Sequence, residues 1–300
     1  MNTQRIAAID IGTNTLLMTI ADVSIHGEVT IIDDIHSIAR LGQNVDSSRN
    51  IQLDAQQRAS SILSSYKQRC NELNVEKIKA VGTSCLRDSA NQTKTCTEFG
   101  QILGCEIEVI SGEEEARLCF IGTVENNEPT TIIDIGGGST EIISGYGDTI
   151  VFRKSLDIGA VRLSERYFKK LPASTANVQS AFDEVRALIQ TIDKQFFFPL
   201  RVVAGTPTTL AAICLGLEHY NAQKIHNYSL GTLSVHIILR ELLELTLDEI
   251  IEMPGVHKDR ADILTAGTLI LHEFLHHSDQ LKCTVSTKGL RFGILKEMAL

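Results

Sequence analysis

Apolar runs typical of β-strands and longer amphipathic stretches typical of helices alternate along the chain, in a similar order in its two halves. In the first half, three β-prone runs predict a meander of strands, and helix and strand patterns then alternate. We expect strands at 6–11, 16–21, 29–33, 78–81 and 106–110, and helices at 53–73 and 95–103. Strands interleaved with helices in this way predict an α/β sheet with helices packed on it.

The second half repeats this plan of a meander followed by helices. We expect strands at 131–135, 141–145, 150–156, 201–204 and 282–285, and helices at 161–168, 178–197, 232–245, 246–253 and 259–276. A length of 300 residues suits two domains of ordinary size. We therefore expect domains at 1–124 and 125–300, with a final helix that is free to pack back on the first domain.

The composition agrees with a globular protein and narrows its class. Apolar residues make up 43% of the chain and charged residues 22%, and no run of about 18 uncharged apolar residues predicts a membrane span. Seven scattered cysteines without a Cys-x-x-Cys pair, and an N-terminus without a signal-peptide pattern, indicate reduced thiols and a cytoplasmic protein. A net charge of −9 and a lack of tryptophan disfavour a basic or stacking surface for nucleic acid.

One motif occurs in both halves: a strand ends in Asp-Ile-Gly, the chain turns through small or hydroxylated residues, and a second strand follows. The clearer copy is TTIIDIGGGSTEIISGY at 130–146, and the fainter copy is IAAIDIGTNTLLMTI at 6–20. Glycines permit positive φ and leave no Cβ in the way, so backbone N–H groups can converge on an anion, and nearby hydroxyls can add donors. Either copy alone could be an ordinary hairpin turn. Two copies 124 positions apart, from Asp10 to Asp134, favour a pair of phosphate-binding loops.

Each of these loops carries a carboxylate, Asp10 or Asp134, that would repel a bound phosphate. We therefore expect the carboxylates to hold a cation that phosphate also binds. Mg²⁺ suits this arrangement because it takes one or two carboxylates and completes its coordination with water and phosphate oxygens.

Two arginines and one helix start are further candidates for phosphate binding, and each arginine also has an ordinary interpretation. Arg40 follows the third strand and is either a solvated side chain or a phosphate ligand. Arg87 follows the fourth strand and a small polar turn, which places it at the carboxyl end of a strand, where ligands of α/β proteins bind. Its alternative role is to serve the helix that comes next. Gly205 and Thr206 begin a helix whose free N–H groups could bind an anion.

Three consecutive glutamates, at 113–115, come shortly before the second copy of the motif. Ser111 is a suitable N-cap with Glu114 three residues later, as in a capping box, and acidic side chains in a first turn favour the helix dipole. Helix initiation therefore explains two of the glutamates and leaves one without a role.

The segment HEFLH at 272–276 matches the His-Glu-x-x-His pattern of zinc proteases. The pattern fixes only three positions, and packing of a helix in the core already explains the apolar residues around it. We therefore favour an ordinary core helix over a zinc centre.

Six motifs, taken together and in order, resemble the exopolyphosphatase / guanosine pentaphosphate phosphatase family. They span almost the whole chain and are DIGTNT at 10–15, TSCLRDSAN at 83–91, ISGEEEARL at 110–118, DIGGGSTE at 134–141, RAD at 260–262 and GLR at 289–291. The chain also resembles the larger superfamily of actin, sugar kinases and heat-shock ATPases. This resemblance implies two tandem actin-like (RNase H-like) domains, each a mixed five-stranded sheet with helices on both faces, and a cleft between them.

The resemblance implies a role for each matching residue. Glu115 matches the catalytic base that activates water against a terminal phosphoryl group. Asp134 and Glu141 match the acids that hold Mg²⁺ (or Mn²⁺), with Asp10 facing them from the first domain. The expected phosphate-binding residues, which include the helix start at 205–206, are Gly12, Thr13, Asn14, Thr15, Arg87, Gly136, Gly137, Gly138, Ser139, Thr140, Gly205, Thr206, Arg260 and Arg291.

We therefore expect an Mg²⁺-dependent exopolyphosphatase that removes the terminal phosphoryl group of inorganic polyphosphate and releases orthophosphate. The alternatives are a guanosine pentaphosphate (pppGpp) 5′-phosphohydrolase, a kinase of the superfamily, and a non-catalytic sensor of alarmone nucleotides. The expected partners are polyphosphate or guanosine penta- or tetraphosphate, with no specific nucleic acid and no membrane. The sequence leaves the oligomeric state open, with a homodimer as one option. The chain resembles the short form of the family and has Phe292 where the family often has an acid.

Overall fold

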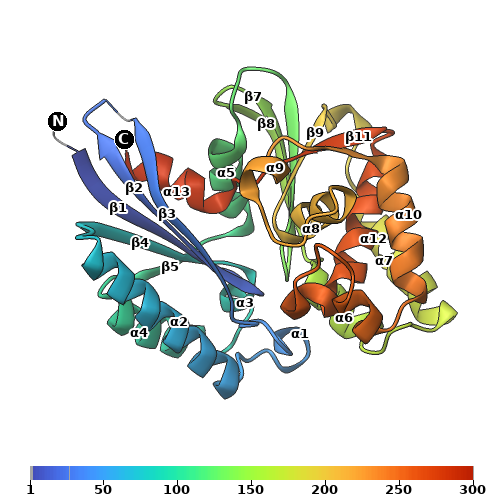
Figure 1. The fold of residues 1–300 in the computed structure, drawn as a ribbon, viewed down its shortest axis with the longest axis horizontal. Coiled ribbons are helices and arrows are strands. Elements are labelled where there is room, and N and C mark those ends of the chain that lie inside the picture. The colour runs from blue at the N-terminus through green and yellow to red at the C-terminus, as the bar shows by residue number, and fades with distance from the viewer. Residues whose placement is uncertain (1–2, 27, 300) are drawn as a thin grey trace. The chain divides into compact units, whose positions relative to one another are not determined.

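The structure is a computed structural model and describes residues 3–26 and 28–299. The chain forms two compact units, whose elements are labelled in Figure 1. Unit 1 comprises Met1–Thr123 and Gly289–Leu300, and unit 2 comprises Val124–Lys288. The first boundary is adjacent to the one expected at residue 124. The second boundary assigns the last twelve residues, 289–300, to unit 1.

Unit 1 is a mixed sheet covered by helices. Among the residues described, its sheet has five strands in the order β3-β2-β1-β4-β5. Strand β2 is antiparallel to both β1 and β3, whereas β4 is parallel to β1 and β5 is parallel to β4. Its strands are β1 (Thr3–Ile11), β2 (Thr15–Ser24), β3 (Val29–Ile38), β4 (Lys77–Gly82) and β5 (Ile107–Val109). Its helices are α1 (Val45–Ser48), α2 (Leu53–Glu72), α3 (Ser84–Arg87), α4 (Gln92–Leu103), α5 (Gly112–Thr123) and α13 (Leu290–Met298).

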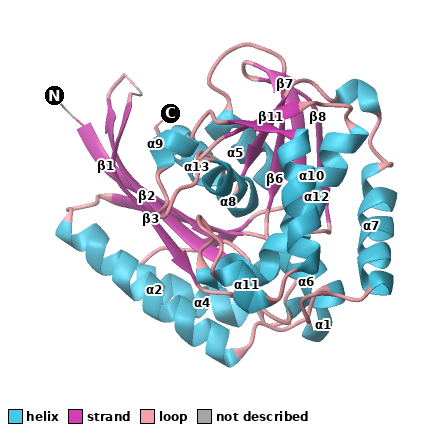
Figure 2. Cartoon of the chain, turned by 45° about the vertical axis from the view of Figure 1, so that its right-hand side comes forward, coloured by secondary structure: helices cyan, strands magenta, loops and turns pink. Residues whose placement is uncertain are grey.

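Strand β1 is buried on both faces of the sheet, because its side chains are apolar both at odd-numbered and at even-numbered positions. Ile9 and Ile11 belong to a core that includes α2 and α4, whereas Ile6 and Ala8 belong to a core that includes α5 and α13. Successive side chains of a strand point to opposite faces, so helices cover both sides of the sheet, and Figure 2 shows α2 and α4 together on one side. This double coverage explains why the run at 6–11 is almost continuously apolar.

The last helix, α13, packs against α5 and β1 within unit 1. A Cβ atom at Gly293 would lie 1.9 Å from the carbonyl oxygen of Leu118, so a larger residue would force the two helices apart. Glu297 of α13 also binds Lys79 and Arg117. These contacts explain why the end of the chain belongs to unit 1.

Unit 2 contains a second mixed sheet, with one strand more than expected. In the described part of the chain its order is β10-β11-β9-β6-β7-β8, and the additional strand is β10 at the edge, which the sequence did not predict because it has only three residues. The strands are β6 (Thr130–Ile135), β7 (Thr140–Tyr146), β8 (Thr149–Leu156), β9 (Leu200–Val203), β10 (Ser229–Gly231) and β11 (Lys282–Val285). The helices are α6 (Ala160–Tyr167), α7 (Thr175–Ile189), α8 (Gly205–Cys214), α9 (Ala222–Ile225), α10 (Thr232–Glu244), α11 (Leu247–Ile251) and α12 (Ala261–His277).

Helix α12 is the central helix of unit 2 and packs against α6, α7, α8 and α10. Its buried residues include Leu264, Leu271 and Phe274, as the core interpretation of this helix predicts. The expected helix at 178–197 is shorter in the structure: α7 ends at Ile189, and Asp193 caps a separate 3₁₀ turn at Lys194–Phe196. Within the residues described, every helix is too short or too polar to span a lipid bilayer.

Candidate functional site

The carboxyl ends of three parallel strands lie side by side in unit 1. Strands β1, β4 and β5 end at Ile11, Gly82 and Val109, and these residues are neighbours in the sheet. The chain leaves these ends into the first glycine loop, into α3 and toward α5. Ligands of α/β sheets bind at this edge, so the topology gathers three segments that hold the expected site residues of this unit other than Arg291.

Arg87 and Glu115 contact each other at this edge. The Nη1 atom of Arg87 lies 3.1 Å from Oε2 of Glu115 and donates a second hydrogen bond to the carbonyl oxygen of Ile110 at 2.9 Å. Glu115 is only 8% exposed, so its charge is compensated within the protein. The guanidinium fixes the orientation of the carboxylate, which is a requirement for a general base.

The three glutamates have different surroundings. Glu113 is exposed, and the carboxylate of Glu114 binds Arg117. The Glu114 N–H donates to Oγ of Ser111, as expected of an N-cap. Glu115 is the buried glutamate of the three. Burial therefore identifies it as the glutamate that helix initiation leaves without a role.

Cys85 of α3 is buried beside the first glycine loop and forms a hydrogen bond with Thr13. Burial raises the pKa of the Cys85 thiol to about 12, a hydrogen bond with Thr13 lowers it, and the charges of Asp10 and Glu115 raise it again. The thiol is therefore protonated at neutral pH and is not a nucleophile. The hydrogen bond joins the first glycine loop to the buried side chain of Cys85. The sequence assigned no role to Cys85, since a lone cysteine carries no pattern.

The two glycine motifs fold into the same turn. The Gly12 N–H donates to the carbonyl oxygen of Thr15 at 3.2 Å, and the Gly136 N–H donates to that of Ser139 at 3.0 Å. In the part of the chain that the structure describes, no protein acceptor receives the N–H groups inside the turns, which are those of Thr13, Asn14, Gly137 and Gly138. Consecutive N–H groups of this kind form an anion-binding nest.

Helix α6 holds the second loop from one side. Each glycine carbonyl of the loop accepts a hydrogen bond from this helix: Gly136 from the N–H of Ala160, Gly137 from the N–H of Val161, and Gly138 from Nε of Arg162. A Cβ atom at Gly159 would lie 2.5 Å from the carbonyl group of Gly137, so only glycine permits this approach. Gly159 and Arg162 were not predicted, because their role depends on contact with a loop more than 20 residues away.

The hydroxyl groups of the second loop are also buried. Thr140 donates its hydroxyl hydrogen to the carbonyl oxygen of Ile158 at 2.6 Å, and Ser139 is 2% exposed. This hydrogen bond therefore stabilises the loop. Binding of phosphate by Thr140 stays a prediction.

The loop that contains Arg40 supports the first glycine loop. The N–H groups of Ala39 and Arg40 both donate to the carbonyl oxygen of Asn14, and the Gly42 N–H donates to that of Thr13. Arg40 has a φ of 50°, which is uncommon for a residue other than glycine. These contacts place the Arg40 backbone beside the loop, and the binding of phosphate by its side chain stays a prediction.

Asp134 and Glu141 face each other across strands β6 and β7. Side chains directly opposite on antiparallel strands have Cβ atoms about 4.5–5.5 Å apart, and like charges in this arrangement are destabilising. Glu141 is 1% exposed and accepts a hydrogen bond from Oγ of Ser155 at 2.7 Å. A divalent cation that prefers oxygen ligands would compensate both carboxylates, so the pair fits Mg²⁺.

The equivalent of Asp134 in unit 1 is Asp10, but its cross-strand partner is Leu17. The second carboxylate is therefore present in unit 2 alone. Among the residues described, no group of three or more His, Cys, Asp or Glu side chains is arranged to hold a metal. The expectation that Asp10 faces Asp134 and Glu141 stays a prediction.

The start of α8 contacts Arg260 in unit 2. A Cβ atom at Gly205 would lie 1.4 Å from Nη1 of Arg260, so the guanidinium rests on the backbone at the helix N-terminus. Ala204, just before the helix, has a φ of 78°, a strained conformation of the kind found at ligand sites. Thr206 is 6% exposed, and burial lowers the pKa of Arg260. Because a guanidinium and a helix N-terminus are both electropositive, their contact favours an anion between them.

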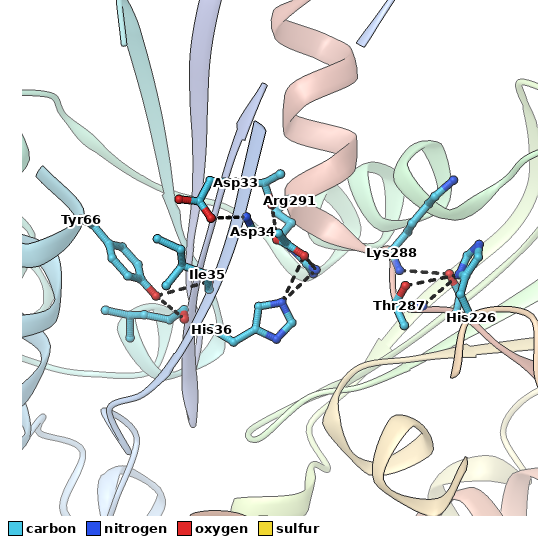
Figure 3. A network of polar contacts seen from close by, with 12 residues as sticks. Asp33, Asp34, Ile35, His36, Tyr66, His226, Thr287, Lys288 and Arg291 are labelled. Carbon is cyan, nitrogen blue, oxygen red and sulfur yellow. Dashed lines mark hydrogen bonds and ion pairs between the residues drawn. The ribbon is translucent and has the colours of Figure 1, made fainter. Parts of the chain in front are cut away.

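Arg291 forms an ion pair with Asp34 of β3 within unit 1, as Figure 3 shows. Its Nε and Nη2 atoms donate to the two carboxylate oxygens of Asp34, both at 2.8 Å, and Nη2 lies 3.1 Å from Nε2 of His36. Its guanidinium also lies 4.8 Å from the ring centre of Phe292. Arg291 therefore joins the last helix to β3, and its contact with phosphate stays a prediction.

The contact with Arg291 lowers the pKa of the Asp34 carboxyl group. Burial alone would raise the pKa of Asp34, but hydrogen bonds from His36, Arg291 and Thr19 outweigh burial and hold the pKa well below its usual range. Asp34 is therefore ionised throughout the physiological pH range and serves as the counterion of Arg291.

Comparison with known proteins agrees with these observations. Residues 19–300 match the model of the Ppx/GppA phosphatase family. Exopolyphosphatase 2 of Mycobacterium tuberculosis is 31% identical over 317 residues that cover 98% of each chain. The guanosine-5′-triphosphate,3′-diphosphate pyrophosphatase of Pseudoalteromonas translucida is 30% identical, over 97% of this chain and 59% of that relative. A crystal structure of an exopolyphosphatase-like protein is 27% identical, covers 99% of this chain and 98% of that chain, and has a TM-score of 0.93.

The fold is confirmed as two tandem α/β units of the actin-like type, with mixed sheets of five and six strands. Together with the matching family model, this fold places the chain in the class of phosphatases. The chain belongs to the Ppx/GppA phosphatase family.

Proposed function

We propose that this protein is an exopolyphosphatase, which hydrolyses the terminal phosphoryl group of inorganic polyphosphate and releases orthophosphate. The observation that carries the proposal is the contact between Arg87 and the buried Glu115, at the sheet edge that also holds the first glycine loop. Exopolyphosphatase 2 supports this substrate, because the match to it covers 98% of both chains.

Each of these residues contributes to positioning and charge, which dominate the catalysis of phosphoryl transfer. Glu115 accepts a proton from the attacking water, which forms a bond to the terminal phosphorus as the bridging oxygen departs. Arg87 keeps the carboxylate oriented, and the loop N–H groups bind the phosphate oxygens. A general base of this kind contributes roughly 10²- to 10⁴-fold to the rate.

We propose that Asp134 and Glu141 of unit 2 hold Mg²⁺ or Mn²⁺. When bound, the ion supplies positive charge to the oxygens of the phosphoryl group under attack. The facing carboxylates of β6 and β7 support this role, because they offer oxygen ligands and repel each other without a cation.

The test is phosphate release from short and long polyphosphate, measured beside release from guanosine pentaphosphate, with and without Mg²⁺. We expect phosphate release to depend on Mg²⁺, and we expect kcat/KM for polyphosphate to exceed kcat/KM for guanosine pentaphosphate. Faster release from the nucleotide would favour the second candidate, a pppGpp 5′-phosphohydrolase, to which the 30% identical Pseudoalteromonas relative points.

Two other outcomes would contradict hydrolysis. Calorimetric binding of an alarmone nucleotide without turnover would indicate a sensor, and transfer of phosphate from ATP to a sugar or acid would indicate a kinase. We propose a cytoplasmic location, because seven scattered cysteines without a Cys-x-x-Cys pair are typical of reduced thiols. Light scattering of the purified chain tests the homodimer.

A further inference from the structure

We propose that the outer face of α10 in unit 2 binds a second copy of this chain, with the two α10 helices packed antiparallel about a two-fold axis. Three large apolar side chains are gathered there in contact with solvent: Leu233 is 70% exposed, Ile237 56% and Leu281 87%. Apolar side chains that are exposed singly are ordinary, whereas a cluster of them marks a surface that another molecule covers.

Helix α10 has apolar side chains on both of its faces. The residues of one face are buried in the core of unit 2 and are Val235, Ile238, Leu239 and Leu242. The residues of the opposite face follow the helical spacing, are all exposed, and are Leu233, Ile237, Arg240, Glu241 and Glu244. Figure 1 shows α10 at the periphery of unit 2, where it packs beside α12. Packing within the unit therefore explains only the first of the two apolar faces.

His236 lies at the border between these two faces. Its Nδ1 atom is 3.2 Å from Nε2 of His272 on α12, so its ring is directed toward the neighbouring helix. The outer face is thus left to Leu233 and Ile237 and to the charged residues that follow them.

The start of β11 extends this surface beyond the first turn of α10. The Thr232 N–H donates to the carbonyl oxygen of Leu281 at 2.9 Å, and the Thr232 hydroxyl donates to that of Gln280 at 2.6 Å. These bonds fix Leu281 beside the helix start, and Lys282 follows it as the strand partner of Gly231. We call this surface the α10 face; it consists of the five exposed residues of α10 together with Leu281 and Lys282.

The two ends of the α10 face carry opposite charges. Glu241 and Glu244 lie at the C-terminal end of the helix, Lys282 lies at the N-terminal end, and all three are exposed. Among the residues described, none of the three forms an ion pair within the chain. Glutamates near a helix C-terminus are unfavourable, and α10 has no basic residue in its last turn to offset them. A cation from another molecule would compensate these carboxylates.

A second copy of the chain supplies that cation at the right place. A helix rises about 1.5 Å per residue, so Glu244 lies about 10.5 Å from Ile237 in one direction, and Gly231, the neighbour of Lys282, lies about 9 Å away in the other. Because these distances nearly match, antiparallel packing about Ile237 brings Lys282 of each copy beside Glu244 of the other. Ile237 would meet its own equivalent at the axis, with the apolar side chain of Leu233 packed next to it.

The first test is sedimentation velocity of the full chain at roughly 1–200 µM, a range suited to a small and transient interface. We expect a monomer–dimer equilibrium. Ile237→Asp should raise the dissociation constant by roughly tenfold or more, because it places two carboxylates together at the centre of the interface. The matched control is Leu53→Asp on α2 of unit 1, where the side chain is 69% exposed. It introduces the same charge and should dimerise as the wild type does.

Charge reversal tests the two-fold arrangement itself. Lys282→Glu and Glu244→Lys should each dimerise more weakly than the wild type, since each homodimer then contains two like-charged pairs. An equimolar mixture of these two variants should form heterodimers, because both pairs between the copies then join opposite charges. Native mass spectrometry with one variant isotopically labelled distinguishes the heterodimer from the homodimers.

Three results would each overturn the proposal: a chain that stays monomeric over the whole range, a dimer that Ile237→Asp leaves unchanged, and a mixture without an excess of heterodimers. Flotation of a monomeric chain with phosphatidylcholine vesicles, lost in Ile237→Asp, would assign the α10 face to a lipid surface and would also overturn it. Circular dichroism checks that each variant is folded. If Ile237→Asp does not fold, the mixture decides, because Glu244 and Lys282 are exposed.

Discussion

Nη1 of Arg87 lies 3.1 Å from Oε2 of Glu115, although 28 positions separate the two residues in the chain. Each is held at the end of a different strand-to-helix connection, and the parallel pairing of β4 with β5 brings the connections together. The contact distinguishes Glu115 from the two glutamates beside it. It also gives Arg87 a positioning role besides its predicted contact with substrate.

Glu115→Gln should fold normally and still bind polyphosphate but lose roughly 10²- to 10⁴-fold in kcat, because an amide cannot accept the proton of water. Steady-state phosphate release and calorimetric binding measure the two properties. The matched control is Glu113→Gln, at an exposed position two residues earlier, which should retain the wild-type rate. Full activity in Glu115→Gln would remove the assignment of the base.

Arg87→Gln should lower kcat, because the carboxylate of Glu115 loses the donor that orients it. If Arg87 also binds substrate, KM should rise together with the fall in kcat. Arg87→Lys keeps the charge without the fork of donors, and its kcat should lie between those of the wild type and Arg87→Gln. A wild-type kcat in Arg87→Gln would show that catalysis does not depend on the contact with Glu115.

Asp134→Asn should remove the effect of Mg²⁺ on stability as well as activity. Without metal, the variant should be at least as stable as the wild type, because it no longer places two like charges opposite each other. In millimolar Mg²⁺ the thermal midpoint of the wild type should rise, and that of the variant should not. Asp148→Asn, at an exposed turn of the same sheet, should respond to Mg²⁺ as the wild type does.

Gly159→Ala should displace the second glycine loop. Its Cβ would lie 2.5 Å from the Gly137 carbonyl group, and the forced shift should destabilise unit 2 by about 1–3 kcal/mol and lower kcat/KM. The control is Gly231→Ala, where the nearest atom would be 3.7 Å away and the φ of −75° suits alanine. Wild-type kinetics in Gly159→Ala would show that the loop does not depend on α6.

Asp34→Asn should destabilise unit 1 by about 2–3 kcal/mol, because it leaves the buried Arg291 without its counterion. Asp33→Asn, its neighbour in β3, breaks a more exposed pair with Arg69 and should change stability by less than about 1 kcal/mol. Denaturant unfolding of the three proteins measures both differences.

The pH dependence of the Asp34 effect follows from its lowered pKa. A carboxylate whose pKa is lower in the folded state adds stability above its unfolded pKa, and this stability is lost as the pH falls. The difference between wild type and Asp34→Asn should therefore be complete above about pH 5 and should shrink below about pH 4. A difference that is constant from pH 7 to pH 3 would contradict this account.

From the sequence alone, the order of strands and helices, the repeated glycine motif and the family could be predicted. These features are local: the spacing of apolar residues determines which face is buried, and glycine at a turn determines its conformation. The two loops therefore adopt the same Gly12-to-Thr15 and Gly136-to-Ser139 turn. The three-residue strand β10 was missed because three residues carry no periodicity.

Only the tertiary structure decided which side chains meet. Contacts of Arg87 with Glu115, Arg162 with the second loop, and Arg291 with Asp34 join residues from 24 to 257 positions apart. Such contacts depend on strand order and helix packing, which bring together ends that no local pattern relates. The same is true of His236 and His272, because one lies on α10 and the other on α12. Local chemistry thus identified the segments of the site, and packing assigned each side chain its partner.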